Sequence, residues 1–315
     1  MQDDRFVEFG CVYCVGCDFR IILLEWRSTQ QPSACNCYNR DTIGFHPLSS
    51  ATQRGTTNVA YLARIIIYPI KSLDGMELTQ TSVLASGALK HDREFAIVDA
   101  RGRFVNGKRN AKVHLLQSHF LLANRTVSLQ VQGTATAQIF HLDAQRQALE
   151  ACLSEFFSFE VKLHQNLLAG FPDDTASPGP TVISTATLAE VASWFPGVSL
   201  DEIRRRIRAN IEIDEVPAFW EDRLFTATGD VVAFRIGDVE FQGVNPCQRC
   251  IVPTRDSVTA AAYPKFQKIF MTKRQETLPA WVAKERFNHF FRLSVNTRIL
   301  AAGGKLLQVG DKFEL

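Results

Sequence analysis

The chain has 315 residues, 46% of them hydrophobic, which is enough for one large or two ordinary domains with buried cores. Its 35 Lys and Arg nearly balance its 33 Asp and Glu, and the formal net charge is +2. This charge gives no global basic field for binding nucleic acid or an anionic membrane. We therefore expect a globular protein whose basic sites are local.

The cysteines are unevenly distributed along the chain. Five lie in the first 40 residues and three in the rest: Cys11, Cys14, Cys17, Cys35 and Cys37, then Cys152, Cys247 and Cys250. This is not the disulfide framework of a small secreted domain, and it suits a reducing compartment. The apolar run at 19–26 is far shorter than the roughly 20 residues that span a bilayer, and no secretory signal precedes it. The sequence predicts a cytoplasmic protein without a membrane segment.

Residues 1–57 differ from the remainder, being rich in cysteine and then polar and rich in turn-forming residues. We place a boundary near residue 58. Our interpretation is a leader that is disordered or non-native. The alternative is a small appendage whose cysteines bind an iron–sulfur cluster or zinc, although the Gly and Pro scaffold of a ferredoxin is lacking.

The first half of the main body has the pattern of β-strands. Residues 63–70 form a β-branched and aromatic run that predicts a buried strand, which Pro69 ends. Residues 95–99 and 104–105 flank a polar turn and predict a hairpin. Residues 127–131 alternate apolar with polar side chains, as a half-buried strand does.

Helices are predicted between the strands. Residues 148–157 place their apolar side chains on one helical face. Residues 187–190 and 199–202 both have the spacing of a capping box, so each predicts the start of an amphipathic helix. The second of these helices has four arginines between 204 and 208, where cations complement the helix dipole.

The last third of the chain returns to strands. Residues 231–236 and 239–241 predict a hairpin across the Gly237–Asp238 turn. Residues 292–300 and 305–315 supply further strands, the latter interrupted by a turn at Gly310. Strands on both sides of a few helices predict an α+β fold that is mostly β.

The strongest chemical signal is the pair Cys247 and Cys250, with Arg249 between them. Such a pair is a redox dithiol, half of a zinc site, or a thiolate ligand with a neighbour. The main body has no second Cys-x-x-Cys and no closely spaced histidine pair, which disfavours zinc. Pro253 and the strands that follow disfavour a thioredoxin-like helix. A thiolate beside an arginine is a soft metal ligand, but from spacing alone two buried structural cysteines remain the alternative.

Residues 246–256 resemble the molybdenum-ligand motif of the MOSC family, in the subgroup that contains the mitochondrial amidoxime-reducing component and its bacterial relatives. Further segments resemble that subgroup in the same order along the chain: 67–75, 91–99, 208–211 and 286–290. Phe290 stands where the subgroup often has Tyr, so a contact through that hydroxyl is absent. The resemblance extends from about residue 60 to the C-terminus.

The resemblance implies two associated β-barrel-type domains with a few helices. Residues 58–174 would form the MOSC N-terminal barrel, and residues 175–315 the MOSC domain proper. The cofactor, molybdenum held by a molybdopterin, would lie in a cleft to which both domains contribute.

The resemblance also implies roles for individual residues. Cys250 would coordinate molybdenum, with Cys247 as a neighbour. Eight polar residues would contact the pterin and its phosphate: Lys71, Ser72, Arg93, Ser177, Arg208, Asn210, Gln248 and Arg249. Lysine, arginine and hydroxyl groups suit a phosphate dianion. Asp256 would position or protonate the substrate, although many loop carboxylates only bind the local backbone.

The activity implied is reduction of N-hydroxylated compounds, such as amidoximes and hydroxylamines, by oxygen-atom transfer. It requires an external electron-donor protein of the ferredoxin, flavodoxin or cytochrome type, and no nucleic acid or membrane. The alternatives are a carrier of persulfide sulfur or of the molybdenum cofactor without turnover, and a binding module that works through the N-terminal cysteines. Pyridoxal phosphate is associated with the family by domain architecture, but no lysine here has the context of a Schiff base.

Overall fold

A computed structural model describes residues 59–300 and 303–315. These residues fall in one compact unit, Thr56–Leu315. The interpretation of residues 1–57, including the iron–sulfur or zinc site suggested for their cysteines, lies outside the described residues.

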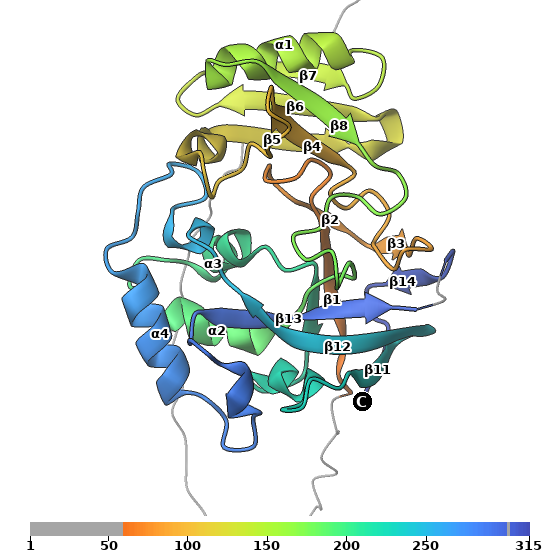
Figure 1. Cartoon of the computed structure of the whole chain (residues 1–315), viewed down its shortest axis with the longest axis vertical. Helices are drawn as coiled ribbons and strands as arrows, with labels where there is room; N and C mark the ends of the chain where they lie inside the picture. The colour runs from red at the N-terminus through yellow and green to blue at the C-terminus, as the bar shows by residue number, and fades with distance from the viewer. Residues whose placement is uncertain (1–58, 301–302) are drawn as a thin grey trace, which may run out of the picture. The chain divides into compact units, whose positions relative to one another are not determined.

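Strands predominate in the fold (Figure 1). The strands are β1 (Tyr61–Ile67), β2 (Met76–Leu78), β3 (Gln80–Ser82), β4 (Phe95–Asp99), β5 (Leu116–Leu121), β6 (Thr126–Val131), β7 (Ala137–His141), β8 (Val161–Gln165), β9 (Val182–Ser184), β10 (Ile211–Asp214), β11 (Val232–Ile236), β12 (Val239–Gln248), β13 (Arg292–Ile299), β14 (Leu306–Gln308) and β15 (Phe313–Glu314). The α-helices are α1 (Arg146–Phe157), α2 (Thr185–Ser193), α3 (Leu200–Ile207) and α4 (Phe266–Glu276). The predicted α+β, mostly β, fold is confirmed.

The largest sheet has eight strands in the order β15-β11-β12-β13-β9-β10-β1-β2. Only β9 and β10 run parallel to each other, and the other neighbours are antiparallel. Leu62, Ile65 and Ile67 of β1 are buried in one core with residues of β9 to β13. The two domains expected from the resemblance therefore share this sheet, because β1 pairs with β10 from the second half of the chain and with β2 on its other side.

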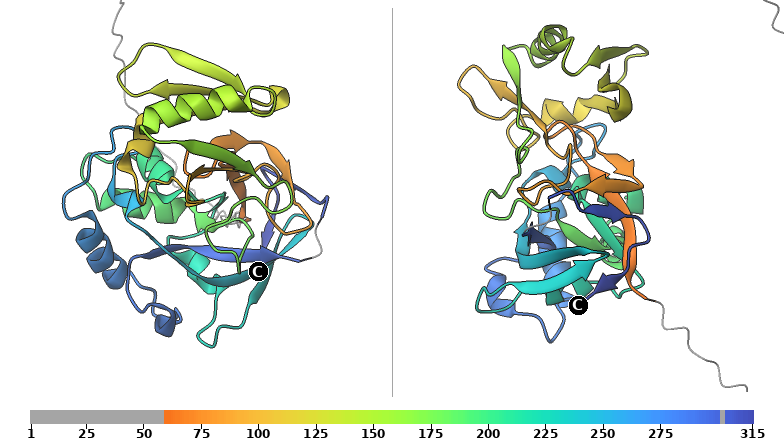
Figure 2. Two further views of the ribbon diagram at one scale, coloured as in Figure 1. Left: turned by 45° about the horizontal axis from the view of Figure 1, so that its top comes forward. Right: turned by 90° about the vertical axis from the view of Figure 1, so that its right-hand side faces the viewer.

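A second core lies under the smaller sheets. Leu149, Leu153 and Phe157 of α1 are buried in it together with residues of the strands β4, β5, β6 and β8, and α1 is drawn across these small sheets at the top of Figure 1 and in both views of Figure 2. The predicted hairpin turn after β4 is present, because Val98 and Phe104 form an antiparallel bridge, and the N–H groups of Asp99 and Val105 donate to the carbonyls of Arg103 and Ile97. Its second arm is too short to form a strand, and the strand that pairs with β4 along its length is β8.

The two predicted capping boxes have different outcomes. Ser199 caps α3, with its side chain accepting a hydrogen bond from the backbone N–H of Glu202. The carboxylate of Glu202 binds Arg206 and Ser257 instead of returning to the cap. The predicted start of α2 at residue 187 is wrong by three residues, because the cap is Ser184 and its hydroxyl accepts from the Thr187 N–H.

The C-terminal strand predictions are confirmed. β11 and β12 form a hairpin in which Ile236 pairs with Val239 across the predicted turn. β13 matches the strand expected at 292–300, and β14 and β15 lie on either side of Gly310. Among the described residues, none of the helices has the length and apolar character needed to cross a membrane.

Candidate functional site

A cavity of about 1350 Å³ lies between segments from both halves of the described chain. Its lining comes from residues 66–119 and 172–296. Eleven Lys and Arg line it, against five Asp and Glu. A concave site with this excess of cations suits an anionic ligand.

Nine of the ten predicted site residues line this cavity: Lys71, Ser72, Arg93, Ser177, Arg208, Asn210, Gln248, Arg249 and Cys250. Lys71 and Cys250 are 179 positions apart in the sequence, and the sheet shared by both halves of the chain brings their segments to one site. The prediction that these residues lie together therefore agrees with the structure, while their individual roles stay predictions.

Asp256 is not among the lining residues. Its Oδ1 accepts hydrogen bonds from the backbone N–H groups of Val258 and Thr259, and its Oδ2 lies 3.4 Å from Arg206 Nη2. Partial burial raises the pKa of Asp256, but the bonds from Thr259 and Val258 outweigh it, and the net pKa is lowered. The carboxylate thus stabilises its own loop, as loop aspartates commonly do.

The loop after β1 supplies Lys71 and Ser72. Lys71 is buried, and its Nζ donates to the carbonyl of Phe171 at 2.8 Å and to Asp173 Oδ1 at 2.6 Å. Burial lowers the pKa of Lys71, with the opposing charge of Asp173 limiting the effect. Ser72 has a φ of 78°, so the chain turns sharply at the cavity wall.

Arg93 lies in a tight turn just before β4. The backbone at His91 and Arg93 is left-handed, with φ of 66° and 50°. Arg93 forms an ion pair with Asp92, and its Nη1 lies 3.4 Å from Asn210 Oδ1. Asp92 Oδ1 in turn accepts from the Tyr68 N–H at 2.9 Å. The hydrogen bond from Tyr68 therefore ties this turn to the segment after β1.

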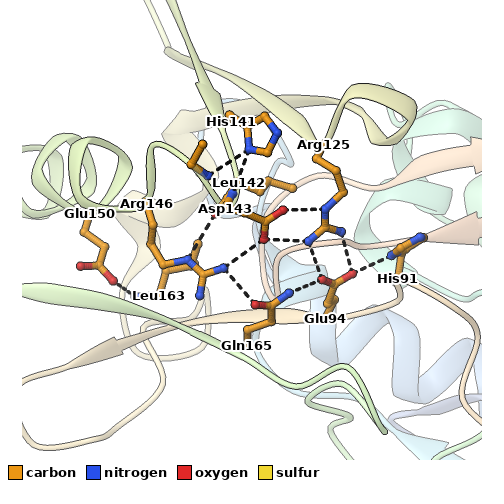
Figure 3. Close-up of polar contacts among 11 residues, drawn as sticks. His91, Glu94, Arg125, His141, Leu142, Asp143, Arg146, Glu150, Leu163 and Gln165 are labelled. Carbon is orange, nitrogen blue, oxygen red and sulfur yellow. Dashed lines mark hydrogen bonds and ion pairs between the residues drawn. The ribbon is translucent and has the colours of Figure 1, made fainter.

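The residue after Arg93 is held by a polar network (Figure 3). Glu94 is buried and accepts from His91 Nδ1 at 2.6 Å, from Arg125 Nη2 at 2.8 Å and from Gln165 Nε2 at 2.6 Å. Arg125 also contacts Asp143. These bonds fix Glu94 on the side of the turn away from the cavity, since Glu94 does not line it.

Arg208 and Asn210 follow α3. Arg208 ends that helix in a left-handed conformation, φ 57°, and its Nη2 donates to the Leu73 carbonyl at 2.6 Å. Asn210 Nδ2 donates to the Ile66 carbonyl at 3.0 Å, and its Oδ1 accepts from Thr181. Asn210 therefore joins β1 to the start of β9 while it faces the cavity.

The two cysteines lie at the end of β12. Cys250 is exposed and Cys247 is half-buried. Arg249 Nη1 lies 3.3 Å from Cys247 Sγ, and its backbone N–H donates to the Phe291 carbonyl at 3.0 Å. The guanidinium of Arg249 thus contacts Cys247 and not the predicted metal ligand, Cys250. The Cys250 side chain is exposed at the cavity.

Four buried polar atoms of the lining have no hydrogen-bond partner among the described residues: Ser177 Oγ, Arg206 Nη1, Arg249 Nε and His114 Nε2. Buried polar groups nearly always have partners, so these atoms mark places where a bound molecule can supply one. His114 was not predicted from the sequence. Its burial, with the charges of Arg208 and Arg255, lowers its pKa to about 4, so the imidazole is neutral near pH 7.

Comparison with family models identifies both parts of the chain. Residues 59–164 match the MOSC N-terminal beta barrel domain, and residues 181–314 match the MOSC domain. The chain is therefore a MOSC-domain protein that carries both domains, and the resemblance to the MOSC family is confirmed.

Its curated relatives include molybdenum cofactor sulfurases. The Drosophila mojavensis protein of that name is 30% identical over 218 residues, which are 60% of this chain and 27% of that protein. Molybdenum cofactor sulfurase 1 of Aedes aegypti is 30% identical over 120 residues, 37% of this chain and 16% of that protein. The chain thus spans about a quarter or less of these relatives. Among solved structures, the YUAD protein from Bacillus subtilis aligns with a TM-score of 0.35 and 9% identity, over 81% of this chain and 94% of that one.

Proposed function

We propose that the cavity binds a molybdenum–molybdopterin cofactor and that Cys250 provides the thiolate ligand of the metal. The observation that carries this proposal is the convergence of the cationic loop residues and the cysteine loop on one cavity. Lys71, Arg93 and Arg208 would hold the phosphate, since ammonium and guanidinium groups pair well with phosphate oxygens.

The residues present fit such a group. The cationic excess of the lining matches an anionic cofactor, and the buried Ser177 Oγ and Arg249 Nε are donors without a partner in the described chain. Ser72 and Gln248 add hydroxyl and amide groups to the same lining. The exposed Cys250 is accessible to a metal at the cavity. When bound, the cofactor would supply two-electron redox chemistry at the metal.

For the reaction, we propose reduction of an N-hydroxylated substrate to the amine or amidine, with two electrons and two protons consumed and water released. The chain's own part is to hold the ligand set and to leave an open face of the cavity for the substrate. The electrons would come from a separate donor protein of the ferredoxin, flavodoxin or cytochrome type. His114 lines the cavity and is neutral near pH 7, so it adds no further positive charge there.

A second candidate is a carrier of sulfur or of the cofactor, without turnover. It is favoured by the relatives, which are named as molybdenum cofactor sulfurases. In that function the exposed Cys250 would carry the sulfur as a persulfide, or the bound cofactor would pass to another enzyme.

The test is the molybdenum content of protein expressed in a host that makes the cofactor. We expect near-stoichiometric metal in the wild type and in Cys247→Ser, and little in Cys250→Ser. Metal-free wild-type protein, or full retention by Cys250→Ser, would contradict the proposal. Reduction of benzamidoxime by the loaded protein with a chemical reductant then separates the two functions, because a carrier retains the metal but produces no benzamidine.

A further inference from the structure

Two arginines that line the cavity and donate hydrogen bonds to carbonyls of β12 take no part in the proposed cofactor contacts. The part of the cavity lining around them is called the β12 wall below. Arg286 ends a short 3₁₀ helix, and Arg292 begins β13. Both line the cavity. Neither position belongs to the set that the sequence predicted to contact the cofactor.

Their hydrogen bonds go to neutral acceptors. Arg286 Nη2 donates to the Val244 carbonyl at 3.1 Å. Arg292 Nη1 donates to the Pro246 carbonyl at 2.9 Å, and its Nε and Nη2 donate to Asn288 Oδ1. In the described part of the chain, no carboxylate forms an ion pair with either guanidinium. Lys71 and Arg93 differ in this respect, because Asp173 and Asp92 pair with them.

The charge at the β12 wall is therefore uncompensated. Burial lowers the pKa of Arg292, and the neighbouring charge of Arg286 lowers it further, while Cys247 acts in the opposite direction. The Cys247 sulfur already accepts a contact from Arg249 Nη1. The β12 wall retains a net positive charge for a mobile anion.

Arg286 also has donors to spare, since only one contact uses them and a guanidinium carries several. Gly229 lies against it: a Cβ built on this glycine would be 2.9 Å from Arg286 Nη1. The glycine thus lets the loop approach the guanidinium without covering it with a side chain.

We infer that Arg286 and Arg292 form an anion subsite that selects substrates bearing a carboxylate or a similar oxyanion near the reacting group. This inference rests on the proposed function, because it takes the Lys71 and Arg93 side of the cavity to be filled by the cofactor phosphate. The subsite lies beside Cys247, on the strand that leads to Cys250, so an anion held there is next to the cysteine loop. The protein would discriminate against neutral analogues of its substrate.

The experiment compares binding of benzoate with binding of benzamide, which has the same ring without the charge, to the molybdenum-loaded protein by calorimetry. We expect benzoate to bind the wild type at least about tenfold more tightly, a difference that one good charge-assisted contact provides. Arg286→Gln and Arg292→Gln should each bring the two dissociation constants close to each other, and Arg286→Lys should keep part of the preference. Arg235→Gln, on the exposed face of β11, is the matched control and should keep all of it.

Equal binding of benzoate and benzamide to the wild type overturns the inference, as does an unchanged preference in Arg286→Gln. Arg286 donates a single hydrogen bond in the described chain, so its variant remains informative if Arg292→Gln does not fold. Molybdenum content reports separately on the proposed function. If the wild type holds no metal but prefers benzoate, and Arg93→Gln keeps that preference, the subsite stands and the cofactor proposal fails.

Discussion

The guanidinium of Arg208 lies 4.0 Å from the centre of the Tyr68 ring, and that of Arg93 lies 5.2 Å from it. Tyr68 is buried, and its hydroxyl donates to the Ala209 carbonyl at 3.3 Å. Burial raises the pKa of Tyr68 to about 12, although both arginines oppose the shift. The ring is therefore neutral, and its π-face stabilises two like charges that the cavity needs side by side.

This geometry predicts different effects for two substitutions of Tyr68. Tyr68→Phe keeps the ring and loses one buried hydrogen bond, at a cost of about 1 kcal/mol in stability. Tyr68→Leu also removes the surface on which both guanidiniums rest, at about 1 kcal/mol for each contact. We expect phosphate to bind Tyr68→Phe within about twofold of the wild type and Tyr68→Leu roughly tenfold more weakly.

Calorimetric titration with inorganic phosphate on the metal-free protein measures both values. Equal weakening by the two substitutions would show that the hydroxyl, and not the ring, orders the arginines. Tyr61→Leu on the half-buried start of β1, away from the cavity lining, is the control.

The lowered pKa of Glu94 predicts that the protein loses stability in acid. Its burial raises the pKa, but hydrogen bonds from His91, Arg125 and Gln165 outweigh this and hold the pKa at about 2, against 4.5 ordinarily. A carboxyl whose folded-state pKa is lowered stabilises the fold above its unfolded pKa, and this contribution is lost as the pH falls from 4.5 towards 2. The contribution at neutral pH is about 3 kcal/mol.

Urea unfolding of wild type and Glu94→Gln tests this. The glutamine variant should be less stable at pH 7 by about this amount, and the gap should narrow at pH 3 because the unfolded wild type then binds a proton at Glu94 that the folded state does not. A gap of the same size at both pH values would mean that the charge of Glu94 is not what stabilises the turn.

The raised pKa of Glu221 predicts the opposite dependence of stability on pH. It is buried next to Asp222, and within the described residues the charge of Arg274 and a hydrogen bond from Thr187 act against the shift. Burial first, and then the charge of Asp222, raise the pKa of Glu221 to about 7. Because the folded state binds the proton more tightly than the unfolded state, stability is highest below pH 4.5 as far as this group is concerned and falls as the pH rises to 7.

The expected loss between pH 5 and pH 8 is about 3 kcal/mol in the wild type. Glu221→Gln, which keeps the contact with Thr187 without the charge, should flatten the profile over this range. Urea midpoints measured at the two pH values give the comparison. A profile as steep in the variant as in the wild type would assign the effect to other groups, with Asp222 the first to examine.

The local signals of the sequence were sufficient for the elements that local chemistry determines. The hairpin of β11 and β12 follows from its Gly-Asp turn, and the start of α3 follows from the spacing of Ser199 and Glu202. The candidate site residues could be predicted as one group because the motifs that contain them resemble those of the MOSC family in the same order along the chain. The spacing of Cys247 and Cys250 alone did not distinguish a metal ligand from a structural pair.

Pairings between distant segments left no such signal. The partner of β4 is β8, some sixty residues further on, and the partner of β1 is β10, about 150 residues further on. These partners are chosen by burial of whole faces, which single-sequence patterns do not encode. For the same reason, nothing local placed Arg286 and Arg292 in the cavity or directed Arg249 towards Cys247.

Substitution of Gly243 tests whether close backbone packing positions the loop that carries Cys247 and Cys250. It lies in β12, and a Cβ built there would be 1.9 Å from the Leu224 carbonyl oxygen, inside the main core. Gly243→Ala therefore requires the strand or the 3₁₀ helix carrying Leu224 to move, and we expect it to cost about 3 kcal/mol of stability. Gly303→Ala is the matched control, because its nearest neighbour is 3.3 Å away on an exposed turn, and its cost should be within about 0.5 kcal/mol.

Urea unfolding measures the two costs, and molybdenum content of the folded fraction measures the consequence for the site. Since β12 leads directly to Cys247 and Cys250, a displaced strand should reduce metal retention in Gly243→Ala even where the protein remains folded. If Gly243→Ala is destabilised but retains as much metal as Gly303→Ala, the cysteine loop is positioned by its own contacts, such as the hydrogen bond from Arg249 to Phe291, and not by the packing of the strand beneath it.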